Sequence, residues 1–192
     1  MSFRYLKGLC ALLMGVALIG ALSPVPAGAA MRAPVHCPGS GLHPTSENLE
    51  TVEAATLCLI EIRRVSRHRG MLRHNVALDH VALHKARLMV HKDYFADIGP
   101  SGQSPLAMVS ASTYPLGTAW YSIGQNLAWG TGDETTPARI VAAWMASPPH
   151  RAIMLDPRYR DAGVGTFPAT PAVIGAGRQG ATYAMEFGVR SR

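Results

Sequence analysis

Segments with the spacing of helices come first in this chain, and short segments typical of strands come last. Apolar residues recur at helical spacing over 46–69, 75–92 and 137–147. Short segments rich in β-branched and aromatic residues follow at 162–167, 172–176 and 182–189. Because few strand–helix–strand alternations occur, this order predicts an α+β fold with a small, largely antiparallel sheet.

Local signals predict where several of these elements begin and end. Ser46 is an available N-cap for the first helix, Gly70 is a natural stop, and Asn75 is a cap for the second helix. The stripe of the second helix that we expect to face the core is Leu78, Ala82, Ala86 and Met89. The other predictions are a strand within 122–130, a short helix at 104–111 and a hairpin turn at 177–180.

The first thirty residues have the layout of a secretory signal peptide. Arg4 and Lys7 precede an uncharged apolar run at 8–22, and the small residues at 27–30 offer a cleavage site. The alternative is a membrane anchor, but a spanning helix needs about 20 apolar residues and this run is shorter. We therefore expect removal of residues 1–30, no membrane span afterwards, and a secreted, extracellular or periplasmic protein.

The remaining chain has the size of a single domain. It shows no internal repeat and no second hydrophobic block, so we expect an N-terminal arm at 31–45 and one domain at 46–192. The whole chain has 18 Lys and Arg against 12 Asp and Glu, a net charge of +6. These cations are dispersed, whereas nucleic-acid binding needs a dense basic stripe or a recognisable module. The charge suits an anionic envelope polymer and predicts no nucleic-acid partner.

Two cysteines lie outside the signal segment. Cys37 and Cys58 allow one pairing, and export permits a disulfide between the arm and the first helix. The alternative is a nucleophilic thiol at Cys58. Its apolar neighbours indicate a buried sulfur, and a buried thiol without an activating group is unreactive. We therefore predict the disulfide.

Two histidine patterns suggest chemistry that the surrounding sequence does not support. His80 and His84 are four residues apart on a predicted helix, but the glutamate that a zinc protease places after the first histidine is missing. Since the core-facing stripe lies elsewhere on that helix, we expect both histidines to face solvent. Ser147 stands near His150, but the two intervening prolines predict an extended turn rather than a paired nucleophile and base.

The strongest pattern is the order of the motifs along the chain. In order they are LCLIEIRR, MLRHNVALDHVALHKARLMV, YFAD, GPSGQSP, GQNLAWG, WMASPPHRAIMLDPRYRDAGVG and YAMEFG. Together they resemble the secreted CAP family, the cysteine-rich secretory, antigen 5 and pathogenesis-related 1 group, in its bacterial SCP-like branch. The resemblance covers about residues 52–188 and implies a three-layer α-β-α sandwich, which agrees with the α+β prediction.

The resemblance also implies a shallow cavity in which histidines and acids can hold a divalent metal. Three cavity positions fall on Asp97, where histidine is usual, on Gln125, where glutamate is usual, and on His150, which is kept. An acid of the eukaryotic branch falls near Ser147. Because a neutral amide is a poor zinc ligand, we expect weak or absent zinc binding and no resident cofactor.

Two further positions depart from the family pattern, since Glu61 and Ile153 stand where asparagine is usual. A kept fold with altered cavity residues predicts a secreted, non-enzymatic binding module for a lipid, a peptide or a cell-envelope polymer. The alternative is an extracellular hydrolase that uses Asp97 and His150 around a water molecule, with or without a metal. A structural module associated with the envelope is a third possibility. In the first interpretation, His150 fixes a loop or contacts the ligand.

Overall fold

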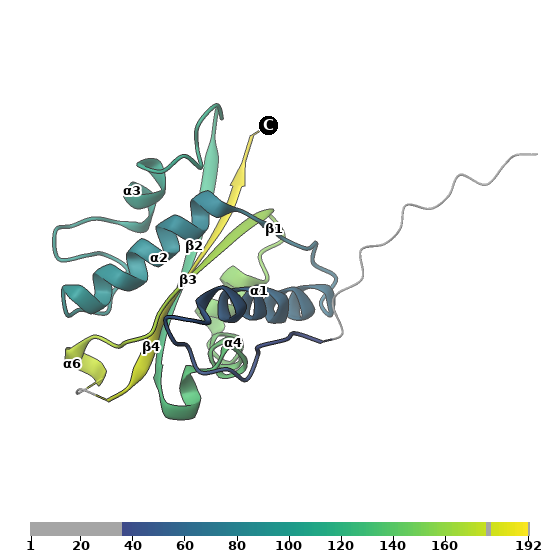
Figure 1. The fold of residues 1–192 in the computed structure, drawn as a ribbon. Helices are drawn as coiled ribbons and strands as arrows, with labels where there is room; N and C mark the ends of the chain where they lie inside the picture. The colour runs from purple at the N-terminus through teal and green to yellow at the C-terminus, as the bar shows by residue number, and fades with distance from the viewer. Residues whose placement is uncertain (1–35, 176–177, 192) are drawn as a thin grey trace, which may run out of the picture. The chain divides into compact units, whose positions relative to one another are not determined.

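The computed structural model of the chain describes residues 36–175 and 178–191 (Figure 1). The elements in chain order are α1 (Leu49–Val65), β1 (Arg73–His74), α2 (Val76–His91), α3 (Pro105–Ser110), β2 (Tyr121–Thr131), the 3₁₀ helix η1 (Gly132–Thr135), α4 (Pro137–Ala146), α5 (Pro148–Met154), β3 (Asp161–Phe167), α6 (Ala172–Gly175) and β4 (Gly180–Arg190). The expected signal peptide and the start of the arm lie outside the described residues, so both stay predictions.

The strands form one four-stranded sheet in the order β1-β3-β4-β2. The long strands β2 and β4 pair antiparallel along their whole length, from Tyr121 opposite Arg190 to Thr131 opposite Gly180. The pairing of β3 with β4 is also antiparallel, and only the two-residue strand β1 runs parallel to its neighbour β3. The prediction of a small, largely antiparallel sheet is therefore confirmed.

Helices cover both faces of this sheet. One face carries α2, and the other carries α1, α4 and α5 (Figure 1). Two glycines of β3 allow α2 to lie very close to the sheet, because a Cβ at Gly165 would be 1.9 Å from the backbone nitrogen of Leu83. A Cβ at Gly163 would be 2.3 Å from the backbone nitrogen of Asp79. These layers form the predicted α-β-α sandwich.

Alternation along the strands divides the core between the two faces. The larger cluster lies beneath α1 and α4 and includes Val52, Trp144, Tyr183 and Phe187. Beneath α2 the sheet contributes Leu127 and Ala184, which pack against the small residues of the helix. All four residues of the predicted α2 stripe have no exposed surface, so that prediction is confirmed.

The predicted start of α2 is confirmed, whereas the predicted start of α1 is wrong. Asn75 caps α2 as predicted, since its side-chain oxygen accepts from the backbone N–H groups of Ala77 and Leu78. The first helix begins at Leu49 rather than after Ser46. The Asn48 side chain binds the loop that precedes it, so the chain turns before the helix starts.

Three predictions about the C-terminal half also differ from the structure. Residues 172–176 were expected to form a strand, but Ala172–Gly175 is a short helix outside the sheet, with backbone N–H groups of Ile174 and Gly175 bonded to the Pro171 carbonyl. The turn expected at 177–180 therefore does not directly follow a strand, because the strand that precedes β4 and pairs with it is β3, which ends at Phe167. Residue 177 lies outside the described residues. Pro148 and Pro149 do not form an extended turn but begin α5, because proline is tolerated in the first helical turn.

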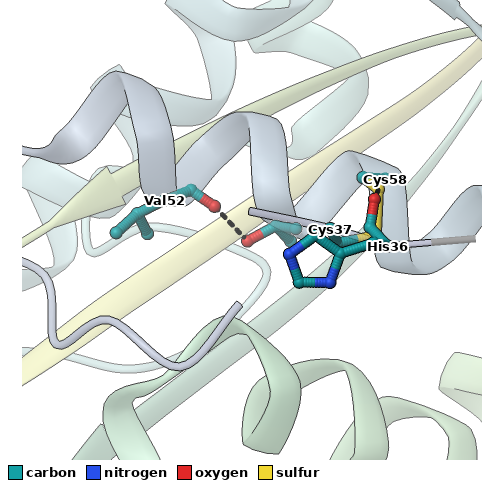
Figure 2. Close-up of a disulfide and its surroundings, with 5 residues drawn as sticks. His36, Cys37, Val52 and Cys58 are labelled. Atoms are coloured by element: carbon teal, nitrogen blue, oxygen red, sulfur yellow. Dashed lines mark hydrogen bonds between the residues drawn. A yellow bond between two sulfur atoms is a disulfide. The ribbon is translucent and has the colours of Figure 1, made fainter. Parts of the chain in front are cut away.

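The predicted disulfide is present. Cys37 and Cys58 are bonded, with their Cα atoms 5.7 Å apart, and Figure 2 shows the bond on α1 beside His36. The alternative of a nucleophilic thiol at Cys58 is therefore wrong. Among the described residues, no helix combines the length and the apolar character that a bilayer span requires.

Candidate functional site

The position where the family usually has glutamate belongs to a buried polar cluster beneath α2. Gln125 on β2 lies opposite Glu186 on β4, so both side chains point to the same face of the sheet. The amide of Gln125 donates to Oε1 of Glu186 over 2.5 Å. Glu186 has no exposed surface. Strand pairing therefore places a carboxyl group where sequence spacing alone gives no sign of one.

Lys85 on α2 brings a cation to the same cluster. Its side chain is fully buried, and its ammonium group donates to the backbone carbonyls of Ala96 and Asp97, both at 2.7 Å. A longer contact of 3.4 Å reaches the hydroxyl of Tyr94. The loop that follows α2 thus closes over the lysine. We call Lys85, Asp97, Gln125 and Glu186 the Glu186 cluster.

Burial shifts the proton equilibria of the two charged groups in opposite directions. It raises the pKa of Glu186 to about 8, although the hydrogen bond from Gln125 and the nearby Lys85 charge act against this shift. Burial lowers the pKa of Lys85, while the charges of Asp97 and Glu186 oppose that change. At neutral pH the Glu186 carboxyl is therefore largely protonated.

The cluster keeps two polar atoms without a hydrogen-bond partner in the described structure. They are Oε1 of Gln125 and Oε2 of Glu186. Asp97 is exposed, and its charge acts on both Lys85 and Glu186. The described interactions thus connect Asp97 and Gln125 only through Lys85 and Glu186.

His150 makes its contacts at the junction of α4 and α5. Its Nδ1 atom lies 2.8 Å from the hydroxyl of Ser147, and its backbone carbonyl accepts from the amide of Asn126 over 3.1 Å. Asn126 and Gln125 are neighbours on β2, so their side chains point to opposite faces. None of the hydrogen bonds in the described part of the chain joins His150 to Asp97 or Gln125.

The contact between Ser147 and His150 corrects the expectation that the prolines hold these residues apart. One helical turn from the N-cap to the third helical residue brings them into contact. A serine nucleophile also needs a group that orients its histidine. Over residues 36–175 and 178–191, no hydrogen bond to the other ring nitrogen of His150 is present. The Ser147–His150 contact is therefore typical of the first turn of a helix, where Ser147 is the N-cap residue of α5. A hydrogen bond from Arg151 to the Met145 carbonyl also joins α5 to the end of α4.

The donor set of the Glu186 cluster does not suit the divalent metal that the resemblance implies. The buried groups are an amide, a largely protonated carboxyl and a lysine ammonium, and the exposed Asp97 is the one further acid. The ammonium repels a second cation, and a single exposed carboxyl does not make a metal site. No group of three or more His, Cys, Asp or Glu side chains in the described residues is arranged to hold a metal ion. His80 and His84 are exposed, as predicted.

Sequence reasoning missed two members of the cluster. Lys85 follows Leu78 by seven residues and Ala82 by three, so helical spacing already places it on the buried stripe. Glu186 gives a weaker signal, because the strand around it is buried on both faces and shows no alternation. Its role becomes clear only from the pairing of β4 with β2, which puts Glu186 opposite Gln125.

Comparison with known sequences agrees with this architecture. The model of the family described as "Cysteine-rich secretory protein family" (CAP) matches residues 61–170. The uncharacterized protein YkwD of Bacillus subtilis is 35% identical over 81 residues, which cover 42% of this chain and 29% of YkwD. This chain thus matches less than a third of that relative.

Solved structures share the fold at low sequence identity. An outer surface protein from Borrelia burgdorferi has a TM-score of 0.60 at 17% identity, over 79% of this chain and 99% of that one. An extracellular protein containing a SCP domain from Bacillus anthracis has a TM-score of 0.56 at 18% identity, over 75% of this chain and 43% of that one. With the family match over more than half of its length, the chain belongs to the CAP, or cysteine-rich secretory protein, family.

Proposed function

We propose that this protein is a secreted, non-enzymatic CAP domain that binds a lipid, a peptide or a cell-envelope polymer outside the cell or in the periplasm. Support for export comes from the signal-like residues 1–30 and from the Cys37–Cys58 disulfide, which an oxidising compartment preserves. The domain carries no resident cofactor and uses no metal.

The observation that carries the proposal is the buried ammonium group of Lys85. It lies among the residues where the family arranges metal ligands, and it is held by two carbonyls at 2.7 Å. A fixed internal cation gives the cluster a structural role, because it holds the loop after α2 through these two carbonyls and repels a metal cation. A largely protonated Glu186 is likewise a poor general base at neutral pH.

One observation favours the alternative of an extracellular hydrolase. The hydroxyl of Ser147 lies 2.8 Å from His150, which is a distance that a serine nucleophile and its base would need. The binding-module proposal instead assigns this contact to the start of α5. The two proposals differ in what the His150→Ala variant does to turnover.

The test is a panel of ester and peptide substrates on the purified, oxidised protein, with Ser147→Ala and His150→Ala beside it. The proposal expects no turnover above buffer in any of the three proteins, and retention of the parent protein on sedimented cell-envelope preparations. Turnover in the parent protein that both variants lose, while keeping their circular dichroism spectra, would establish the hydrolase. No retention on envelope material or on lipid vesicles would contradict the binding role.

A further inference from the structure

A pocket of about 630 Å³ lies between α1, β1, the start of α2 and β3, apart from the Glu186 cluster. Its apolar lining comes from Ala54, Leu57, Met71, Leu72 and Val164. Its ionisable lining comes from Glu50, Glu53, Glu61, Asp79 and His74. The pocket thus combines an apolar wall with four carboxyl groups, in a chain whose net charge is +6.

The edge of β3 faces this pocket with its hydrogen-bond donors already used. The short strand β1 pairs with β3 only at Asp161 and Ala162. Beyond that point, the N–H of Val164 donates to Asp79 over 2.9 Å, and the N–H of Thr166 donates to Glu53 over 2.8 Å. Because N–H and C=O of one strand residue point to the same side, the edge offers carbonyl acceptors beside these carboxyl groups.

Glu61 supplies an independent sign of a missing partner. Its Oε1 atom accepts from the N–H of Leu72 over 2.8 Å, and the side chain is only 4% exposed. Its Oε2 atom has no hydrogen-bond partner in the described structure, although the residue lines the pocket. A buried carboxyl oxygen without a donor is costly, and a ligand that brings donors removes this cost.

The carboxyl groups also repel one another. The pKa of Glu53 is raised to about 7, first by burial and then by the charges of Asp79 and Glu50, while the hydrogen bond from Thr166 and the nearby His74 act against the shift. His74 is the one basic side chain among the lining residues, and its Nε2 is already 2.5 Å from Asp79. Burial also raises the pKa of Glu61, and the charge of the nearby Arg64 acts against this shift. Among its described lining residues the pocket therefore offers carboxyl oxygens, and its one basic side chain is already paired.

We propose that this pocket binds an organic cation, an ammonium or guanidinium group carried on an apolar stem. The cation would donate to Glu61 and Glu53, and the stem would lie against Leu57 and Met71. A bare metal ion fits less well, because much of the wall is apolar and no metal-binding group of three ligands is present in the described residues. The proposal names a ligand class for the binding function proposed above, and rests on that function only for its biological setting.

The test is calorimetric titration of the oxidised protein at pH 8 with hexylammonium and, as an uncharged match, hexanol. We expect hexylammonium to bind at least about tenfold more tightly than hexanol. Glu53→Gln and Glu61→Gln each keep an oxygen for the backbone N–H and remove the charge, so each should weaken hexylammonium about tenfold. Glu47→Gln is the matched control, because Glu47 is exposed and does not line the pocket, and it should bind like the parent.

Two outcomes measured on the parent protein alone would overturn the proposal. These are equal binding of hexylammonium and hexanol, and no binding of either. A loss in Glu47→Gln as large as in Glu53→Gln would also overturn it, since the effect would then come from net charge. Comparing N-acetylarginine amide with the tripeptide Ala-Arg-Ala assigns the cation to a free small molecule or to a peptide. Failure of this test leaves the substrate panel unaffected, because that panel measures turnover and not binding in this pocket.

Discussion

At the scale of single residues, the main feature is a set of buried ionisable side chains. Lys85 and Glu186 are both fully buried, and each has the pKa shift that favours its uncharged form. Such groups are weak contributors to stability when paired and costly when a partner is lost. The same reasoning applies to the half-buried Glu53, whose pKa is also raised.

The raised pKa of Glu186 predicts a specific dependence of stability on pH. Between its ordinary value of 4.5 and about 8, the folded protein holds a proton that the unfolded chain has released. The contribution of this group to the free energy of unfolding is therefore complete below pH 4.5 and is lost as the pH rises through 8. The loss is at most about 1.4 kcal/mol per pH unit. Urea unfolding at pH 5 and pH 8.5 should show a smaller fall in Glu186→Gln than in the parent. Identical falls in the two proteins would contradict the assignment.

At the scale of elements, the contact between α2 and the sheet depends on small residues on both sides. Gly163 of β3 lies against the α2 backbone at Leu78 and Asp79, and Gly165 lies against it at Ala82 and Leu83. Ala82 and Ala86 pack with Leu127 and Ala184 of the neighbouring strands, so the helix that carries Lys85 lies close to the sheet. The loop after α2 then supplies the carbonyls that hold the ammonium group. The position of the cluster is thus a consequence of how closely the helix packs.

Gly165→Ala tests this packing. The added Cβ would overlap the α2 backbone, so we expect the free energy of unfolding to fall by about 3 kcal/mol. Gly41→Ala is the control, since nothing lies within 4 Å of its Cβ position, and it should change stability little. Both values come from urea unfolding at one pH. A loss at Gly41 equal to that at Gly165 would show that the α2 contact is not the cause.

At the scale of the whole molecule, a disulfide ties the N-terminal arm to the sandwich. It joins Cys37 and Cys58 across a sequence separation of 21 residues, and Cys58 also lines the acidic pocket. The arm is therefore fixed next to a surface that we propose to bind ligand. A basic chain that carries this acidic pocket can present different surfaces to an anionic envelope and to a cationic ligand.

Removing this disulfide should destabilise the protein without changing its fold. The bond restricts a loop of this length in the unfolded chain. We therefore expect the free energy of unfolding of the double variant Cys37→Ser/Cys58→Ser to be about 3 kcal/mol lower than that of the parent. Reduction of the parent protein should produce the same loss, and reduction of the variant should produce none. Equal stability of parent and variant would mean that the bond does not constrain the unfolded chain.

Much of the fold could be predicted from the sequence, because periodicity and caps are local. The α2 helix, its Asn75 cap and the strands β2, β3 and β4 all follow from such signals. The prediction of a strand at 172–176 is wrong because apolar, β-branched residues alone do not show whether a neighbouring strand is available for pairing. The two-residue strand β1 is too short to leave any pattern.

The candidate site was harder to predict, since it depends on pairing across the sheet. The resemblance identified Asp97, Gln125 and His150, but it could not show that Gln125 binds Glu186 or that Lys85 lies beside them. Glu61 was noted only as a departure from the family pattern. Its burial and its unpartnered oxygen follow from the arrangement of α1 and β1, which no local pattern describes.

An internal lysine stands beside two positions where the family resemblance implies metal ligands, and zinc titration by calorimetry tests the consequence of this placement most directly. The measurement uses the oxidised parent protein with His150→Ala and Gln125→Ala beside it. We predict no saturable zinc binding at micromolar concentrations in any of the three. Micromolar binding by the parent that Gln125→Ala abolishes would contradict the claim, because the Glu186 cluster would then hold a metal despite Lys85.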